Sequence, residues 1–72
     1  MTEAHVLLRE WRISKGLTQA QCAAMVDVAQ PTWNAWENNV RNPHIEFAVK
    51  IEDITGGFVP VRAWLKSTGT DG

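Results

Sequence analysis

The segment from residue 17 to residue 39 has the pattern of two short helices joined by a tight turn. Thr18 is a favourable N-cap for the first of them. Pro31, which lacks an amide N–H, is tolerated only in the first turn of the second. Between them lies Asp27, where the turn requires a positive φ that glycine adopts easily and aspartate tolerates. The pattern therefore predicts one helix after Thr18 and another beginning at residue 29 or 30.

The second of these helices has two faces of different chemistry. At ~100° per residue, Trp33 and Trp36 lie on one face and are expected in the core. Gln30, Asn34 and Asn38 recur every fourth residue and form a stripe on the other face. Lys and Glu are better helix formers for a solvated face, whereas Gln and Asn can pair with adenine in the DNA major groove. The stripe therefore indicates a helix that reads DNA.

The positions beside the stripe carry small side chains. Pro31 and Ala35 would let this helix approach DNA closely and could contact a thymine methyl group. We therefore expect the base-reading residues to be Gln30, Pro31, Asn34 and Ala35. The simpler alternative, that Asn34 and Asn38 are ordinary solvated polar residues, stays open.

This arrangement resembles the helix-turn-helix of the lambda repressor and Cro family. The residues at the positions of the family pattern are Leu8, Arg12, Gly16, Leu17, Thr18, Gln19, Cys22, Ala23, Asp27, Val28, Gln30, Trp33, Trp36, Glu37 and Pro43. The resemblance implies an all-α fold of four to five short helices, in which helices two and three form the helix-turn-helix and the third reads DNA. It also implies a transcriptional regulator that binds a palindromic operator as a dimer.

The resemblance assigns further contacts by position. Gln19 corresponds to a residue that contacts a DNA phosphate and braces the first reading residue, Gln30. Asn38 corresponds to a phosphate contact after the recognition helix, and Arg41 to a contact from the following loop. We expect His44 at the start of the next helix, where it would also contact phosphate.

One pair of charged residues and several departures from the family pattern concern stability. Arg12 and Glu37 correspond to an ion pair that ties the first helix to the end of the third. Cys22 replaces the usual leucine and is expected to be a small buried hydrophobe. Asp27 stands in place of glycine, and Ala29 in place of a Ser or Thr cap, a loss of about 1 kcal/mol.

The rest of the chain predicts three more helices, over residues 3–15, over residues 45–54 and from residue 60 onward. Pro60 is suited to the first position of the last helix, which we favour over a terminal hairpin of the kind found in some Cro proteins. Trp11 either covers the contact between the first and last helices or is half exposed. The domain is expected to span residues 1–66 and to be followed by a flexible tail, 67–72.

The last helix also bears on assembly. One recognition helix reads too few base pairs for useful specificity, so two copies are expected, with their reading helices ~34–36 Å apart on DNA. Phe58, Val61 and Trp64 have more apolar surface than a short terminal helix needs. We expect them to form a weak two-fold contact between copies that is completed on DNA.

The charge distribution is the main argument against DNA binding. The net charge is −1, and residues 18–40 contain neither Lys nor Arg, although phosphate attraction normally depends on them. Arg9, Arg12 and Lys15 precede that window, and Arg41 follows it. An alternative therefore stays open: a protein-interaction module on the same fold, such as an antitoxin.

Composition excludes other classes. One cysteine and two histidines supply neither a nucleophile with an orienting base nor metal-ligand spacing. We therefore expect no enzyme activity, metal, cofactor or small-molecule ligand. Neither a signal peptide nor a membrane-spanning run is apparent, which predicts a cytoplasmic protein and no membrane partner. The preferred interpretation is a Cro-like phage or prophage repressor.

Overall fold

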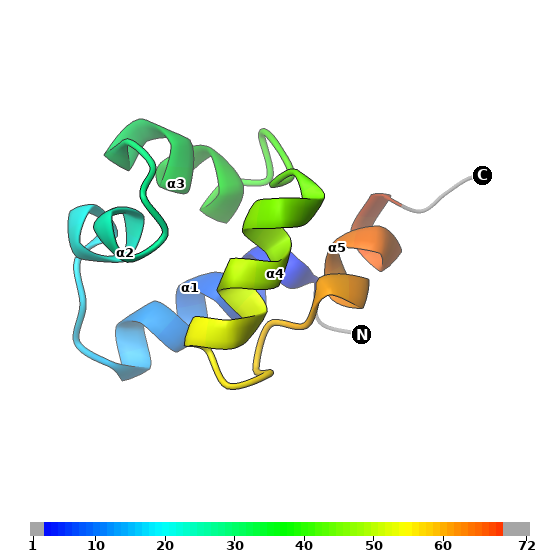
Figure 1. The fold of residues 1–72 in the computed structure, drawn as a ribbon, viewed down its shortest axis with the longest axis horizontal. Helices are drawn as coiled ribbons and strands as arrows, with labels where there is room; N and C mark the ends of the chain where they lie inside the picture. The colour runs from blue at the N-terminus through cyan, green and yellow to red at the C-terminus, as the bar shows by residue number, and fades with distance from the viewer. Residues whose placement is uncertain (1–2, 69–72) are drawn as a thin grey trace.

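Five helices follow one another along the chain, and no strand occurs among the residues that the structure describes (Figure 1). The computed structural model describes residues 3–68, with side chains as far as Leu65. The helices are α1 (Ala4–Ser14), α2 (Gln19–Met25), α3 (Gln30–Glu37), α4 (Ile45–Ile54) and α5 (Val61–Thr68). Helix α2 lies at one end of the molecule's long axis and α5 at the other. The predicted all-α fold, with the helix-turn-helix at helices two and three, is confirmed.

The signals at the helix-turn-helix act as the sequence predicts. The Thr18 hydroxyl accepts a hydrogen bond from the Gln21 amide at 3.1 Å, and the Gln21 side chain accepts one from the Thr18 amide at 2.8 Å. This reciprocal capping box starts α2. Asp27 has a φ of 64° in the turn. Helix α3 begins after Ala29, whose side chain makes no capping hydrogen bond, and Pro31 lies in its first turn.

The outer helices differ slightly from expectation. Helix α1 is one residue shorter than predicted at each end. Helix α5 begins one residue after Pro60, and its first amide, that of Val61, donates to the Glu52 carboxylate at 3.1 Å. A side chain of α4 therefore caps α5. Because α5 runs to Thr68, it includes the first two residues of the expected tail; the other four lie outside the described residues.

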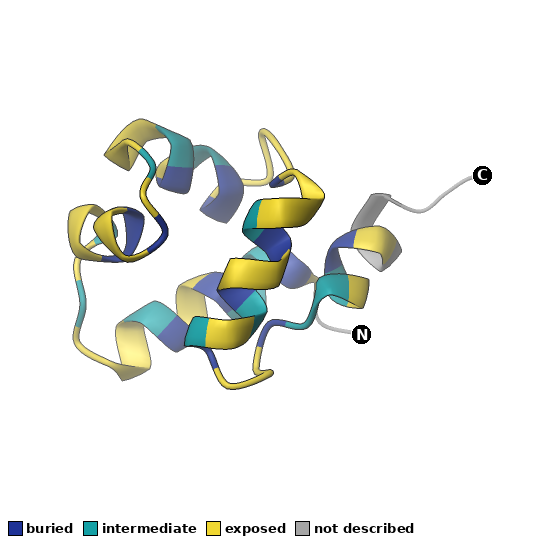
Figure 2. Ribbon diagram, viewed as in Figure 1, coloured by how far each residue is buried: buried dark blue, intermediate teal, exposed yellow. Residues whose placement is uncertain are grey.

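The core is formed by the sides of the helices that face one another (Figure 2). Its buried apolar residues are Ala4, Leu8, Trp11, Cys22, Ala23, Val26, Trp33, Trp36, Ala48, Ile51, Val59 and Trp64. The Trp36 ring lies 5.7 Å from that of Trp33 and 6.0 Å from that of Phe47, between centroids, within the range of favourable aromatic pairs. Trp11 is only 6% exposed, which excludes the half-exposed alternative.

Cys22 is fully buried, as expected from its place in the second helix. Burial raises the pKa of its thiol, while the positive charge of Arg12 acts in the opposite direction and the negative charge of Glu37 adds to the increase. Because the thiolate is the reactive form, Cys22 is a structural residue.

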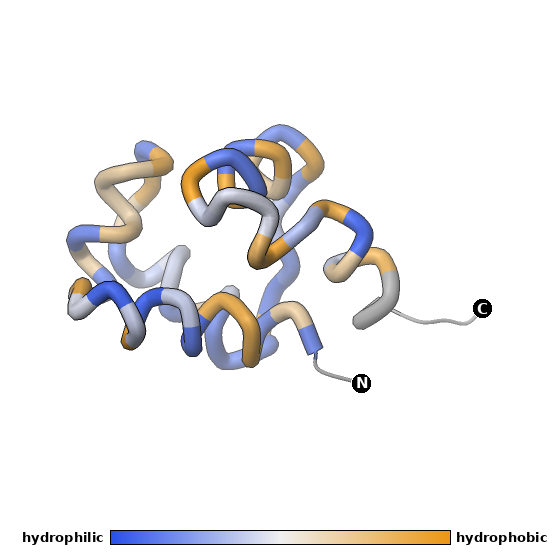
Figure 3. The backbone as a smooth tube through the Cα atoms, turned by 90° about the horizontal axis from the view of Figure 1, so that it is seen from below, coloured by the Kyte–Doolittle hydropathy of each residue, from blue (hydrophilic) through white to orange (hydrophobic). Residues whose placement is uncertain are grey.

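Both polar and apolar positions occur within each helix, as hydropathy along the backbone shows (Figure 3). In α4, Ala48 and Ile51 are buried, but Ile45 and Val49 are exposed. The apolar residues of α4 therefore extend beyond the side of the helix that faces the core. Within residues 3–68, none of the helices has the length and apolar character needed to cross a membrane.

Candidate nucleic-acid interface

The outer face of α3 displays the amide stripe that the sequence predicts. Gln30, Pro31 and Asn34 are exposed, and Ala35 is half-buried beside them. The tryptophans on the opposite face are buried. The four expected base-reading residues therefore share one accessible helix face, which is free of large side chains that would prevent a close approach.

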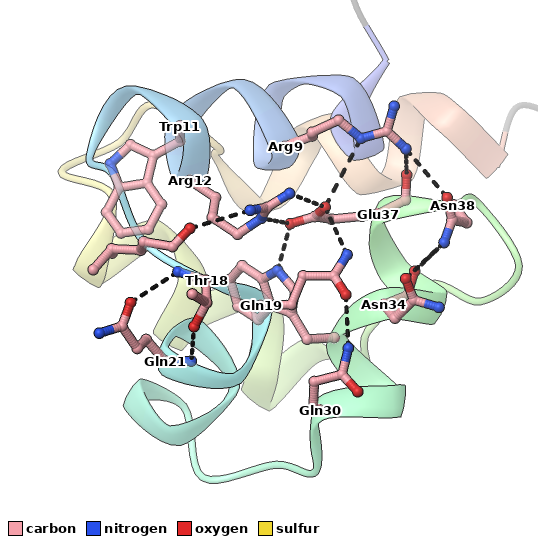
Figure 4. A network of polar contacts seen from close by, with 12 residues as sticks. Arg9, Trp11, Arg12, Thr18, Gln19, Gln21, Gln30, Asn34, Glu37 and Asn38 are labelled. Atoms are coloured by element: carbon pink, nitrogen blue, oxygen red, sulfur yellow. Dashed lines mark hydrogen bonds and ion pairs between the residues drawn. The ribbon is translucent and has the colours of Figure 1, made fainter.

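A buried carboxylate at the end of α3 connects three helices (Figure 4). Glu37 accepts hydrogen bonds from Arg12 of α1 at 2.6 Å to Oε2 and 3.1 Å to Oε1. The indole N–H of Trp33 donates to Oε2 at 2.6 Å, and Nε2 of Gln19 donates to Oε1 at 3.1 Å. Arg12 and Glu37, the pair implied by the resemblance, thus meet in a bidentate geometry that favours charge-assisted hydrogen bonds.

The surroundings of Glu37 keep it ionised. Burial alone would raise the pKa of its carboxyl, but hydrogen bonds from Arg12, Trp33 and Gln19, together with the positive charge of Arg12, lower that pKa below its usual value. The pKa of Arg12 is raised, mainly by its hydrogen bond to Glu37. Both members of the pair are therefore charged near neutral pH.

This arrangement predicts acid sensitivity. Because the folded-state pKa of Glu37 is depressed, its stabilising effect is fully present above the unfolded-state value, near 4.5, and is lost as the pH falls through the folded-state value. We expect the thermal midpoint to fall as the pH is lowered from 5 to about 2. Glu37→Gln should reduce this dependence, and Glu10→Gln, which removes an exposed carboxyl, is the matched control. Identical acid profiles for the wild type and Glu37→Gln would contradict the prediction.

Gln19 links the buried carboxylate to the exposed amide face of α3. Its Nε2 donates to Glu37, and its Oε1 accepts a hydrogen bond of 2.7 Å from Nε2 of Gln30. The bracing of Gln30 by Gln19 that the resemblance implied is therefore present without DNA. A side chain held in this way loses less conformational freedom when it binds.

A second series of contacts reaches Asn34 from α1. Nη2 of Arg9 donates to Oδ1 of Asn38 at 3.2 Å and to the Glu37 carbonyl at 3.2 Å. Nδ2 of Asn38 in turn donates to the backbone oxygen of Asn34 at 3.0 Å and to its Oδ1 at 2.9 Å. Asn38 is the C-cap of α3, so this series crosses from α1 to the end of α3.

Asn38 contacts other side chains of the same domain. It directs its amide nitrogen at Asn34, and its contact with a phosphate stays a prediction. Arg9, which we did not assign to the site, has an exposed charged group at the same place. A sequence signal existed: Arg9 lies three residues before Arg12, hence on the same face of α1.

The other two residues expected to contact phosphate lie on the surface. Arg41 is exposed in the loop after α3, and His44 is the exposed N-cap of α4.

The three residues expected to form a contact between copies differ in burial. Phe58 is 48% exposed and Val61 half-buried, whereas Trp64 is only 3% exposed. Trp64 therefore belongs to the core of the single chain, and the expectation that it contributes to a dimer surface is not supported.

Comparison with models of known protein families gives a match. The sequence pattern of the helix-turn-helix family covers residues 8–57, which is more than half of the chain. It includes α2, α3 and α4 entirely and the part of α1 that carries Arg9 and Arg12. No significant match was found among curated proteins or among solved structures.

Proposed function

Since the chain belongs to the lambda repressor and Cro-like family of helix-turn-helix DNA-binding regulators, we propose that it is a Cro-like repressor that binds a palindromic operator as a dimer. Occupation of the operator would block RNA polymerase sterically. The protein would then act where the operator DNA lies, in the cytoplasm.

The braced amide of Gln30 is the observation that supports this proposal most directly. One of its N–H groups is engaged by Gln19, which leaves the second N–H and Oε1 for DNA. An outward donor and acceptor on one amide suit the N7 and N6 groups of adenine. Pro31 and Ala35 beside it leave space for the major-groove edge.

The phosphate contacts of this proposal come from few groups. Arg9 and Arg41 are exposed on either side of α3 in sequence, and Gln19 has one N–H that is not used by Glu37. Hydrogen bonds to phosphate orient a protein on the duplex without specifying sequence. Base readout at α3 must therefore supply a large part of the preference for an operator.

The test is selection of bound DNA from a random pool, followed by binding of Gln30→Ala to the selected site. We expect a loss of about 1–3 kcal/mol on that site and relaxed preference at one base pair. Because Gln30 is exposed, the thermal midpoint should barely change. Asn42→Ala, another exposed amide outside the network, is the control.

Two results would contradict parts of the proposal. Equal weakening of Gln30→Ala on every sequence would mean that Gln30 does not read a base. Absence of any DNA complex at low salt and micromolar protein would exclude a repressor and favour the protein-interaction module.

A further inference from the structure

Two series of side-chain hydrogen bonds end on the reading face, and each begins at a charged group (Figure 4). The first runs from Glu37 through Gln19 to Gln30. The second runs from Arg9 through Asn38 to Asn34. The charges at the two origins have opposite sign, and this difference determines how each terminal amide is turned.

The first series starts at an acceptor. An ionised carboxylate can only accept hydrogen bonds, so Gln19 must turn its nitrogen toward Glu37. Its oxygen then faces Gln30, which must donate its own nitrogen in turn, as the distances of 3.1 and 2.7 Å show. The Gln30 oxygen is thereby left for solvent or DNA.

The second series starts at a donor and runs in the opposite sense. A guanidinium can only donate, so Asn38 turns its oxygen toward Arg9 and its nitrogen toward Asn34. The Asn34 oxygen is thereby engaged at 2.9 Å, and its nitrogen is left outward. Capping of α3 would need only the 3.0 Å bond to the Asn34 carbonyl; the second bond fixes the amide of Asn34.

We propose that Arg9 and Asn38 are positioning residues that determine which bases Asn34 can read. They turn its two N–H groups outward, so Asn34 favours a base edge with acceptors, as in guanine (O6 and N7) or thymine (O4). Gln30 is oriented by the series that begins at the negative charge of Glu37, so it favours an edge that offers a donor, as in adenine or cytosine. This inference rests on the proposed function, because it requires α3 to lie in the major groove.

The decisive variant is Asn38→Asp. Aspartate keeps the shape of asparagine and an acceptor for Arg9, but it has no N–H to give to Asn34. Asn34 must then donate its nitrogen to residue 38 and present its oxygen outward. In selection from random DNA, the preference at the Asn34 position should change from guanine or thymine to adenine or cytosine by about tenfold or more.

The controls separate this effect from charge and stability. Asn39→Asp introduces the same charge at the adjacent exposed residue, which also has a positive φ of 60° that aspartate tolerates. It should weaken binding without changing any preference. Asn34→Ala identifies the base pair concerned, and the base pair facing Gln30 is an internal reference.

A second pair of variants keeps the test valid if Asn38→Asp folds poorly. Arg9→Ala removes the group that orients Asn38, so preference at the Asn34 position should relax. Arg9→Lys restores a donor and should recover the preference that Arg9→Ala loses.

The outcomes distinguish the inference from the function on which it rests. If the wild type selects an operator and neither Asn38→Asp nor Arg9→Ala alters a base preference, the inference is overturned while the DNA-binding function stands. If the wild type selects no sequence at all, both fail.

Discussion

Substitution of Glu37 by alanine should lower the free energy of unfolding by about 3–5 kcal/mol, because it leaves one buried and one partly buried donor without their acceptor. Arg12 and the indole N–H of Trp33 both donate to this carboxylate at 2.6 Å. A small domain has a net stability of roughly 5–15 kcal/mol, so the variant should be only marginally folded at 25 °C. Urea denaturation followed by tryptophan fluorescence measures the change.

A double-mutant cycle tests whether the pair itself is responsible. Arg12→Ala alone leaves a buried carboxylate with only its neutral donors and the more distant Arg9, whose Nε lies 3.8 Å away. We expect the double variant to be much less destabilised than the sum of the single variants, with an interaction energy at the upper end of the roughly 0.5–3 kcal/mol range for contacting residues. Simple additivity would show that the contact at 2.6 Å contributes little.

Phe58→Glu should have the largest effect on operator binding. If two copies meet through this region, a charge at the half-exposed Phe58 prevents their contact. Affinity for the complete palindrome should fall by roughly 10²–10⁴-fold, toward that of a single half-site. Titration of DNA carrying one or two half-sites measures this loss, and the monomer's thermal midpoint should be unchanged.

The matched control for that substitution is Ile13→Glu. Ile13 is an exposed apolar residue at the end of α1, and it receives the same charge. It should leave cooperativity intact. Cooperative occupation of both half-sites by Phe58→Glu would place the contact on another apolar surface, of which the exposed pair Ile45 and Val49 on α4 is the next candidate.

Local signals predicted the helices well because each acts over a few residues. The Thr18 cap, the Asp27 turn and the position of Pro31 define the helix-turn-helix to within a residue. Periodicity likewise separated the buried tryptophans of α3 from its exposed amides. These effects depend on backbone geometry that neighbouring residues determine.

Features that depend on contacts between distant parts of the chain were harder to predict from the sequence. Arg12 and Glu37 are 25 positions apart, and only the family resemblance suggested their pairing. The contact of Arg9 with Asn38 spans 29 positions and was not predicted. Trp64 was assigned to the surface because hydropathy cannot distinguish the side of α5 that meets α1 from a side that meets a second copy.

The shared carboxylate of Glu37 has a consequence for how such a regulator can evolve. A change at Pro31 would alter the exposed face of α3 proposed to read DNA without touching the network, so new DNA preferences could arise there with little loss of stability. Gln19, in contrast, has to donate to Glu37 and accept from Gln30 at once. Among uncharged side chains of its length, glutamine alone has both groups. If α3 reads DNA as proposed, divergence of this regulator toward other DNA sites should therefore proceed through the small residues of α3 before it reaches residue 19.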